Sequence, residues 1–222
     1  MDSRALFFGG AMSRRTWLAA HCSLLALAVP VRALAAQRVI LIVGDSLSAE
    51  YGLPRGAGWV ALLEKRLAAE KIDARVVNAS ISGETTSGGR SRIAALLKEH
   101  RPTHVVLELG GNDALRGLPL AMTQANLTEM ARASKAAGAK VVVAGMQLPP
   151  NYGRRYSEDF AALFATVAKA EGAALVPFFL KGVGDVPNAV EVYFQPDRIH
   201  PNEKAQPLML DNVWGALRPL LK

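Results

Sequence analysis

Short apolar segments alternate with amphipathic segments five times along this chain, and this alternation limits the folds open to it. Runs such as Val39–Val43 lack polar alternation and predict strands buried on both faces, as in a parallel sheet. The expected strands cover 38–43, 75–78, 104–109, 140–144 and 174–178, and the expected helices cover 59–67, 90–100, 121–137, 160–168 and 203–217. The pattern predicts one three-layer α/β/α domain with right-handed crossovers, and it leaves the strand order open.

The first 36 residues differ in composition from the rest of the chain. Arg14 and Arg15 precede an apolar run over 17–29, and small residues follow at 33–35. A basic start, a short apolar run and small residues together predict a signal peptide over 1–36 that is cleaved at its end. The protein is therefore expected to be exported, to the periplasm or outside a bacterial cell.

The sequence leaves the export route open and predicts a single mature domain. The string Ser13–Leu18 resembles a twin-arginine export signal, but an ordinary basic leader explains it equally well, so the export route stays open. The remaining residues, 37–222, contain no internal repeat or low-complexity linker and are expected to form a single domain.

Charge and cysteine content exclude some classes of function. Four arginines and one aspartate lie in the first 35 residues, so their removal lowers the formal net charge from +7 to +4. No dense Lys/Arg stripe interleaved with aromatic residues is present, so we expect no nucleic-acid partner. Cys22 is the only cysteine and leaves with the signal peptide, which removes cysteine hydrolases from the candidates.

The first expected strand stops abruptly at Gly44-Asp45-Ser46. A serine just past the carboxyl end of a buried strand lies where open α/β sheets bind their ligands. Serine is a weak nucleophile at its own pKa and needs a histidine base that is oriented by a carboxylate. Ser46 is therefore the candidate nucleophile.

His200 is the candidate base. Of four histidines, one lies in the signal segment, while His100 ends a helix and His104 opens a strand at the opposite edge of the sheet. Asp197 precedes His200 by three residues, a spacing that lets its carboxylate accept from one ring nitrogen while the other faces Ser46.

Ester or thioester hydrolysis builds an oxyanion that needs fixed hydrogen-bond donors. The backbone N–H groups of Ser46 and Gly83 and the side-chain amide of Asn112 are suitable donors. Two simpler interpretations remain open, in which Gly83 supplies a tight turn and Asn112 is a turn residue. Asp45 and Asp113 are interpreted as residues that organise loops.

Four sequence blocks carry a family resemblance, and three longer strings extend it. The blocks are Gly44–Ser48, Asn78–Thr85, Gly110–Asp113 and Asp197–Pro201, and the strings are Glu108–Gly117, Asn151–Tyr156 and His200–Pro207. In this order they resemble the SGNH (GDSL) hydrolase family, and in particular its bacterial periplasmic acyl hydrolases. The resemblance covers nearly all of residues 38–220.

The resemblance implies a flavodoxin-like, five-stranded parallel sheet of order 2-1-3-4-5. It implies Ser46, His200 and Asp197 as a catalytic triad, and an oxyanion hole made by Ser46, Gly83 and Asn112, with no metal and no cofactor. The implied activity is that of a serine esterase with arylesterase, acyl-CoA thioesterase and lysophospholipase activity. Its substrates would be small acyl esters, thioesters or lysophospholipids, and we expect a monomer with no stable membrane insertion.

The resemblance also implies where the acyl chain binds. In such enzymes the segment after the second-block glycine, here 84–89, is a mobile flap over the acyl chain, and the loop at Leu148 lines the acyl groove. The expected substrate-binding residues are Ile81, Glu84, Thr85, Leu115 and Leu148. The preferred chain length stays open.

Three alternatives remain. An O-acetyl esterase acting on a polysaccharide would use the same chemistry, although the apolar Ile81, Leu115 and Leu148 favour longer acyl groups. A non-catalytic binding module would be expected to lack a member of the triad, and none is lost. A flavodoxin-like phosphate or flavin site is opposed by Asp45 and Glu50, which lie where phosphate would bind.

Overall fold

The computed structural model describes residues 37–222, so the predicted signal peptide lies outside the described residues. Five strands form one sheet in which every paired strand is parallel. The strands are β1 (Arg38–Gly44), β2 (Ala74–Asn78), β3 (His104–Glu108), β4 (Lys140–Ala144) and β5 (Ala174–Val176). Their order, β2-β1-β3-β4-β5, confirms the order that the family resemblance implies.

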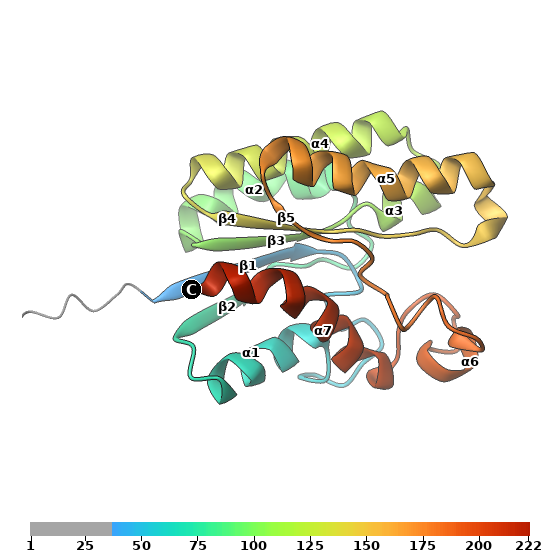
Figure 1. The fold of residues 1–222 in the computed structure, drawn as a ribbon, viewed down its shortest axis with the longest axis horizontal. Coiled ribbons are helices and arrows are strands. Elements are labelled where there is room, and N and C mark those ends of the chain that lie inside the picture. Colours follow the sequence, from blue (N-terminus) through green and yellow to red (C-terminus); the bar gives the residue numbers. More distant parts are fainter. Residues whose placement is uncertain (1–36) are drawn as a thin grey trace, which may run out of the picture. The chain divides into compact units, whose positions relative to one another are not determined.

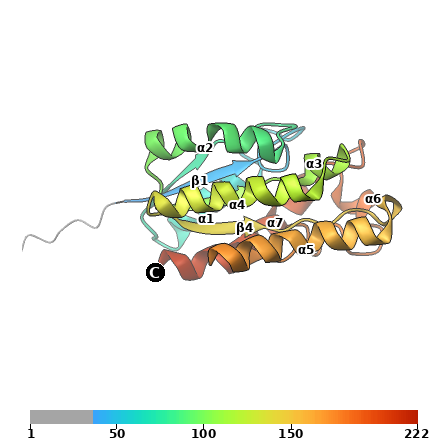
Figure 2. The ribbon, with the colours of Figure 1, turned by 90° about the horizontal axis from the view of Figure 1, so that it is seen from above.

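Helices cover both faces of the sheet, which confirms the predicted three layers (Figures 1 and 2). One face carries α2 (Thr86–His100), α4 (Leu120–Ala136) and α5 (Arg154–Glu171), and the other carries α1 (Trp59–Ala69) and α7 (Gln206–Leu217). Shorter elements are α3 (Gly111–Leu115), α6 (Ala189–Tyr193) and the 3₁₀ turns Pro150–Tyr152, Glu203–Ala205 and Arg218–Leu221. No helix within 37–222 has both the length and the apolar character needed to cross a bilayer.

The core forms where the apolar segments of the sequence predict it. In β1, residues Ile40–Val43 are completely buried, as expected for a strand with helices on both faces. Helix α5 buries Phe160, Leu163, Phe164 and Val167, which are spaced by three or four residues and so share one face of the helix.

Several elements differ from the expected boundaries: α5 begins at Arg154 rather than at 160, α7 begins at Gln206 rather than at 203, and two further differences have a local cause. β5 ends at Val176, earlier than expected, because Pro177 has no backbone N–H to donate to a neighbouring strand. Helix α2 begins at Thr86, earlier than expected. Gly88 and Gly89, which predicted a loop, lie in its first turn, and Gly89 packs closely against Leu109. A Cβ on Gly89 would lie 2.4 Å from Cδ1 of Leu109, so a larger residue would require either the buried Leu109 side chain or the helix to shift.

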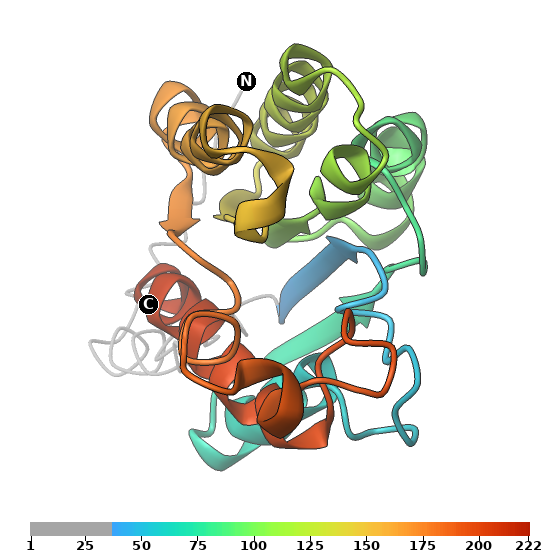
Figure 3. The same cartoon turned by 90° about the vertical axis from the view of Figure 1, so that its right-hand side faces the viewer.

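All five strands end at the same edge of the sheet, because they are parallel. Figure 3 faces this edge and shows the loops after β1, β2 and β3 gathered there with α3 and with the segment that connects α6 to α7. The four polar clusters singled out in the sequence follow these strand ends or lie in that segment.

Candidate active site

Ser46 lies in a tight turn directly after β1. The carbonyl of Asp45 accepts the backbone N–H of Ser48 at 3.2 Å and that of Ala49 at 3.0 Å. The Asp45 carboxylate accepts the N–H of Leu47 at 3.0 Å, so the side chain before the serine closes the turn around it. This agrees with the interpretation of Asp45 as a loop-organising residue.

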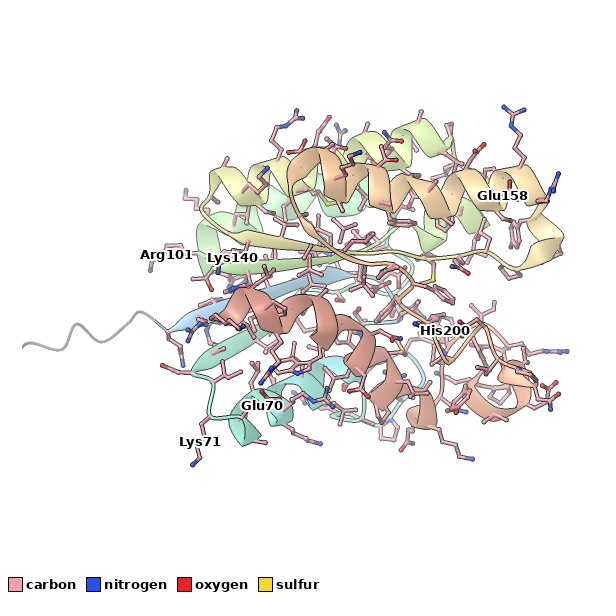
Figure 4. The ribbon with its side chains drawn as sticks, viewed as in Figure 1. Glu70, Lys71, Arg101, Lys140, Glu158 and His200 are labelled. Atoms are coloured by element: carbon pink, nitrogen blue, oxygen red, sulfur yellow. The ribbon has the colours of Figure 1, made fainter. Side chains whose placement is uncertain are left out.

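Ser46, His200 and Asp197 form a continuous chain of hydrogen bonds. Nε2 of His200 lies 3.0 Å from Oγ of Ser46, and Nδ1 lies 2.7 Å from Oδ2 of Asp197. The other Asp197 oxygen accepts the backbone N–H groups of Ile199 and His200, each at 3.0 Å, and so holds the loop under the ring. Figure 4 labels His200 at the carboxyl edge of the sheet, and Arg101 and Lys140 at the opposite edge.

The protonation states in this chain follow from the partners. Burial acts to raise the pKa of Asp197, but the N–H groups of His200 and Ile199 and the His200 ring outweigh it and lower the pKa to about 2. Asp197 is therefore ionised at neutral pH and only accepts hydrogen bonds. Nδ1 of neutral His200 must then carry the proton, which leaves Nε2 as an acceptor for the Ser46 hydroxyl.

The candidate oxyanion donors are held by the same loops. Asn112 donates one amide N–H to Oδ2 of Asp45 at 3.0 Å, and its second N–H remains for another acceptor. Gly83 has a φ of +78°, a conformation that favours glycine, and its carbonyl accepts from Nη2 of Arg116 at 2.8 Å. Within residues 37–222, the backbone N–H groups of Ser46 and Gly83 donate to no protein acceptor.

The loop that carries Gly83 is tied to the end of β1. The N–H of Ile81 donates to the carbonyl of Gly44 at 3.1 Å, and the side-chain amide of Asn78 donates to the carbonyl of Ser48 at 2.7 Å. These two bonds bring the Gly83 loop beside the turn that presents Ser46.

Two carboxyl groups are buried beneath the Ser46 turn. Oγ of Ser48 donates to Glu108 at 2.6 Å, and Nε1 of Trp59 donates to the same Oγ at 3.2 Å. Burial and the neighbouring Asp45 raise the pKa of Glu108 well above its ordinary value. Burial also raises the pKa of Asp45 to about 6, although hydrogen bonds from Leu47 and Asn112 act in the opposite direction.

The apolar residues expected at the substrate site differ in exposure. Ile81 is 51% exposed and Leu115 is 45% exposed, and both lie on segments at the carboxyl edge, after β2 and β3. Leu148 is half-buried and packs against the hydrophobic core. The first two are therefore available to an incoming acyl chain, and Leu148 is available only through its exposed part.

Glu84 and Thr85 are engaged within the protein. Glu84 forms a short ion pair with Arg92, and Thr85 caps α2 by accepting the N–H of Gly88 at 3.4 Å. The segment expected to be a flap over 84–89 is thus, from Thr86 on, the first turn of a helix. Thr85 is an ordinary N-cap residue, but the Ser87-Gly88-Gly89 string that follows it is typical of a loop, so the sequence did not predict a helix start there.

Asp113 fixes the start of that helix. Its carboxylate accepts the backbone N–H of Thr86 at 2.8 Å and the Thr86 hydroxyl at 2.5 Å, and all of these groups are buried. This confirms Asp113 as a loop-organising residue. His104 is also structural, because its ring bonds to Thr103 and to the carbonyl of Leu220, and burial lowers its pKa.

Two neighbours of His200 were not singled out in the sequence. The ring of Tyr51 lies against the imidazole in a tilted arrangement, with centroids 4.2 Å apart and planes at 35°. The side chain of Gln195 donates to the carbonyl of Tyr51 at 2.8 Å. No sequence pattern pairs residues 144 positions apart, so only the three-dimensional structure brings these two to the site.

The chain is similar to known proteins in both sequence and structure. Residues 42–207 match the GDSL-like lipase/acylhydrolase family. The chain is 56% identical to Esterase TesA of Pseudomonas aeruginosa over 187 residues, covering 84% of this chain and 91% of that protein. It is 43% identical to Thioesterase 1/protease 1/lysophospholipase L1 of Escherichia coli K12, covering 84% and 86% of the two chains. The crystal structure of the psychrotrophic esterase EstA from Pseudoalteromonas, inhibited by monoethylphosphonate, superposes with a TM-score of 0.77 at 43% identity, covering 83% of this chain and 99% of that one.

Proposed function

This chain belongs to the GDSL-like lipase/acylhydrolase family and is an ester-hydrolysing enzyme, and we propose that Ser46, His200 and Asp197 are its catalytic triad. One observation carries this proposal. Oγ of Ser46 lies 3.0 Å from Nε2 of His200, whose Nδ1 lies 2.7 Å from an Asp197 oxygen. A nucleophile, a base and an orienting carboxylate within hydrogen-bond reach of one another are the parts that acyl transfer needs.

The reaction follows from the protonation states. Oγ of Ser46 attacks the acyl carbonyl carbon while Nε2 of His200 takes the hydroxyl proton. Ionised Asp197 stabilises the imidazolium that forms, and Nε2 then gives the proton to the leaving alcohol or thiol. Water, activated by the same nitrogen, attacks the acyl-enzyme and releases the acid, and Ser46 regains its proton.

We assign the oxyanion to three donors, the N–H groups of Ser46 and Gly83 and the second amide N–H of Asn112. Asp45 supports this role because its carboxylate fixes the rotation of the Asn112 amide. Arg116 supports it by fixing the Gly83 peptide through the carbonyl. Donors that are already oriented need no reorganisation as charge develops on the substrate oxygen.

Replacing Asn112 with alanine is expected to lower kcat by about 10²- to 10³-fold, because one oxyanion donor is lost while substrate binding is left largely intact. Steady-state kinetics with p-nitrophenyl butyrate measure kcat and KM separately. A thermal unfolding curve serves as control, since Asp45 also loses a partner. An unchanged kcat would leave Asn112 with only a role in the turn.

The proposed substrates are small acyl esters, thioesters and lysophospholipids. The relatives named as esterase, thioesterase and lysophospholipase support this range, and the exposed Ile81 and Leu115 support acyl chains longer than acetyl. The leader-like composition of 1–36 supports export to the periplasm or beyond. We further propose that the enzyme acts as a monomer without inserting into a membrane.

The test is hydrolysis of p-nitrophenyl esters from acetate to palmitate, before and after treatment with a phosphonate, which inhibits the related EstA. Activity that is lost as a phosphonyl group attaches to Ser46 is the expected result. A rate that falls steeply beyond acetate would instead favour the O-acetyl esterase. Absence of both activity and label would support a binding module.

A further inference from the structure

Ser46 and His200 are 154 residues apart, and each lies on an irregular segment rather than on a strand or helix. The Ser46 segment runs from Asp45 to Gly52, and we call it the nucleophile loop. The His200 segment runs from Gln195 to Pro201, and we call it the histidine loop. A reaction that depends on a 3.0 Å contact between two loops needs something that fixes one loop against the other.

Gln195 bonds to both loops. Its backbone N–H donates to the carbonyl of His200 at 2.8 Å, and its side-chain Nε2 donates to the carbonyl of Pro201 at 3.1 Å. The same Nε2 donates to the carbonyl of Tyr51, in the nucleophile loop, at 2.8 Å. Both N–H bonds of one amide group are thereby used, one on each loop.

Tyr51 makes the second connection. Its backbone N–H donates weakly to the carbonyl of Ser46 at 3.4 Å, and its ring lies on the His200 imidazole with centroids 4.2 Å apart. Tyr51 is 49% exposed, so the hydrophobic core does not hold it. Its place is set by the stack on His200 and by the bond from Gln195.

The backbone at Gly52 permits this close approach. Gly52 has a φ of +69°, and a Cβ at this position would lie 2.0 Å from Oε1 of Gln195. The side chain of Gln195 therefore occupies the space that any other residue at 52 would fill. The nucleophile loop and the Gln195 amide fit each other only because this residue is glycine.

We propose that Gln195 and Tyr51 form a clamp that positions His200 against Ser46, a role for two positioning residues that goes beyond the triad and rests on the proposed function. Gln195 sets the separation of the two loops, and the Tyr51 ring restricts rotation of the imidazole. In this role neither side chain transfers a proton or bonds to the substrate. Their loss should therefore slow the chemical step and leave substrate binding in place.

The experiment replaces each part of the clamp and measures kcat and KM for p-nitrophenyl butyrate. Gln195→Glu keeps the shape of the side chain and removes both N–H donors. Tyr51→Leu removes the aromatic face, and Tyr51→Phe keeps it. Gln124→Glu, on α4, makes the same chemical change at a position outside the clamp and is the matched control.

The expected result is a fall in kcat of about 10²-fold for Gln195→Glu, with KM little changed, because small misplacements of reacting groups have effects of this size. The kcat of Tyr51→Leu should also fall, while the kcat values of Tyr51→Phe and Gln124→Glu should stay near that of the wild type. The double variant Gln195→Glu/Tyr51→Leu should lose less than the product of the two single losses, because both act on one group.

A wild-type kcat in Gln195→Glu, or a loss confined to KM, would overturn the clamp. Should Gln195→Glu fail to fold in a thermal unfolding assay, Gln195→Met, which is uncharged and of similar length, takes its place with the same expected loss. The phosphonate separates this proposal from the previous one. Wild-type protein labelled at a residue other than Ser46 would refute the triad itself, whereas normal labelling of Ser46 at equal rates in wild type and Gln195→Glu would refute only the clamp.

Discussion

Replacing Ser46 with alanine is expected to lower kcat for p-nitrophenyl butyrate by about 10⁴- to 10⁶-fold, a loss of the size seen when a serine nucleophile is removed. Alanine leaves His200 and the proposed oxyanion donors in place but provides no oxygen to form the acyl-enzyme. The fold should persist, because Ser46 lies in a turn and its hydroxyl bonds only to His200 among residues 37–222.

Two measurements check this expectation. Kinetics give the residual rate, and mass spectrometry after phosphonate treatment should find no label on the variant. Ser157→Ala is the matched control, since this buried hydroxyl has no hydrogen-bond partner within the described part of the chain. Activity near the wild-type level in Ser46→Ala would remove Ser46 from its proposed role.

Replacing Asp197 with asparagine is expected to lower kcat by about 10⁴-fold with a much smaller effect on KM. Asparagine can keep the bonds to the N–H groups of Ile199 and His200 through its oxygen. Its amide N–H groups, however, face Nδ1 of His200 and favour the tautomer in which Nε2 carries the proton. That tautomer cannot accept the proton of Ser46.

Measurement of kcat and KM over the pH range in which the wild type is active provides the check, because the wrong tautomer of His200 lowers kcat rather than raising KM. Asp185→Asn, in which the altered carboxylate bonds only to the N–H of Gly182 within residues 37–222, controls for loss of one negative charge. A pure KM defect in Asp197→Asn would contradict the orienting role.

The sheet could be predicted because its signal is local. Four consecutive apolar residues in β1 are each completely buried, and the sequence pattern already required strands of this kind. The strand order was not in the pattern, and it came only from the family resemblance. The sequence predicted too late a start for α2 because Gly88 and Gly89 are typical of loops. In the structure, the absence of a side chain at Gly89 allows the helix to lie close to Leu109.

The candidate site was predictable to the extent that its residues carry chemistry at short spacing. Asp197 and His200 lie three residues apart, and Ser46 directly follows a strand end. Tyr51 and Gln195 could not be found in this way. A contact between two rings and a hydrogen bond from a side-chain amide to a distant carbonyl have no local sequence pattern, because the partners meet only through the fold.

The carboxyl of Asp45, which holds Asn112, has a consequence for the balance between stability and activity. Its pKa is about 6 in the folded protein, against an ordinary value of 3.8 for an exposed aspartate. Between pH 3.8 and about pH 6 the native state therefore keeps a proton that the unfolded chain releases. The free energy of unfolding therefore falls as pH rises through this window, and the loss is complete above it. At neutral pH the protein thus retains a buried negative charge that lowers the free energy of unfolding, and the carboxylate that carries this charge holds the amide of Asn112, the proposed oxyanion donor.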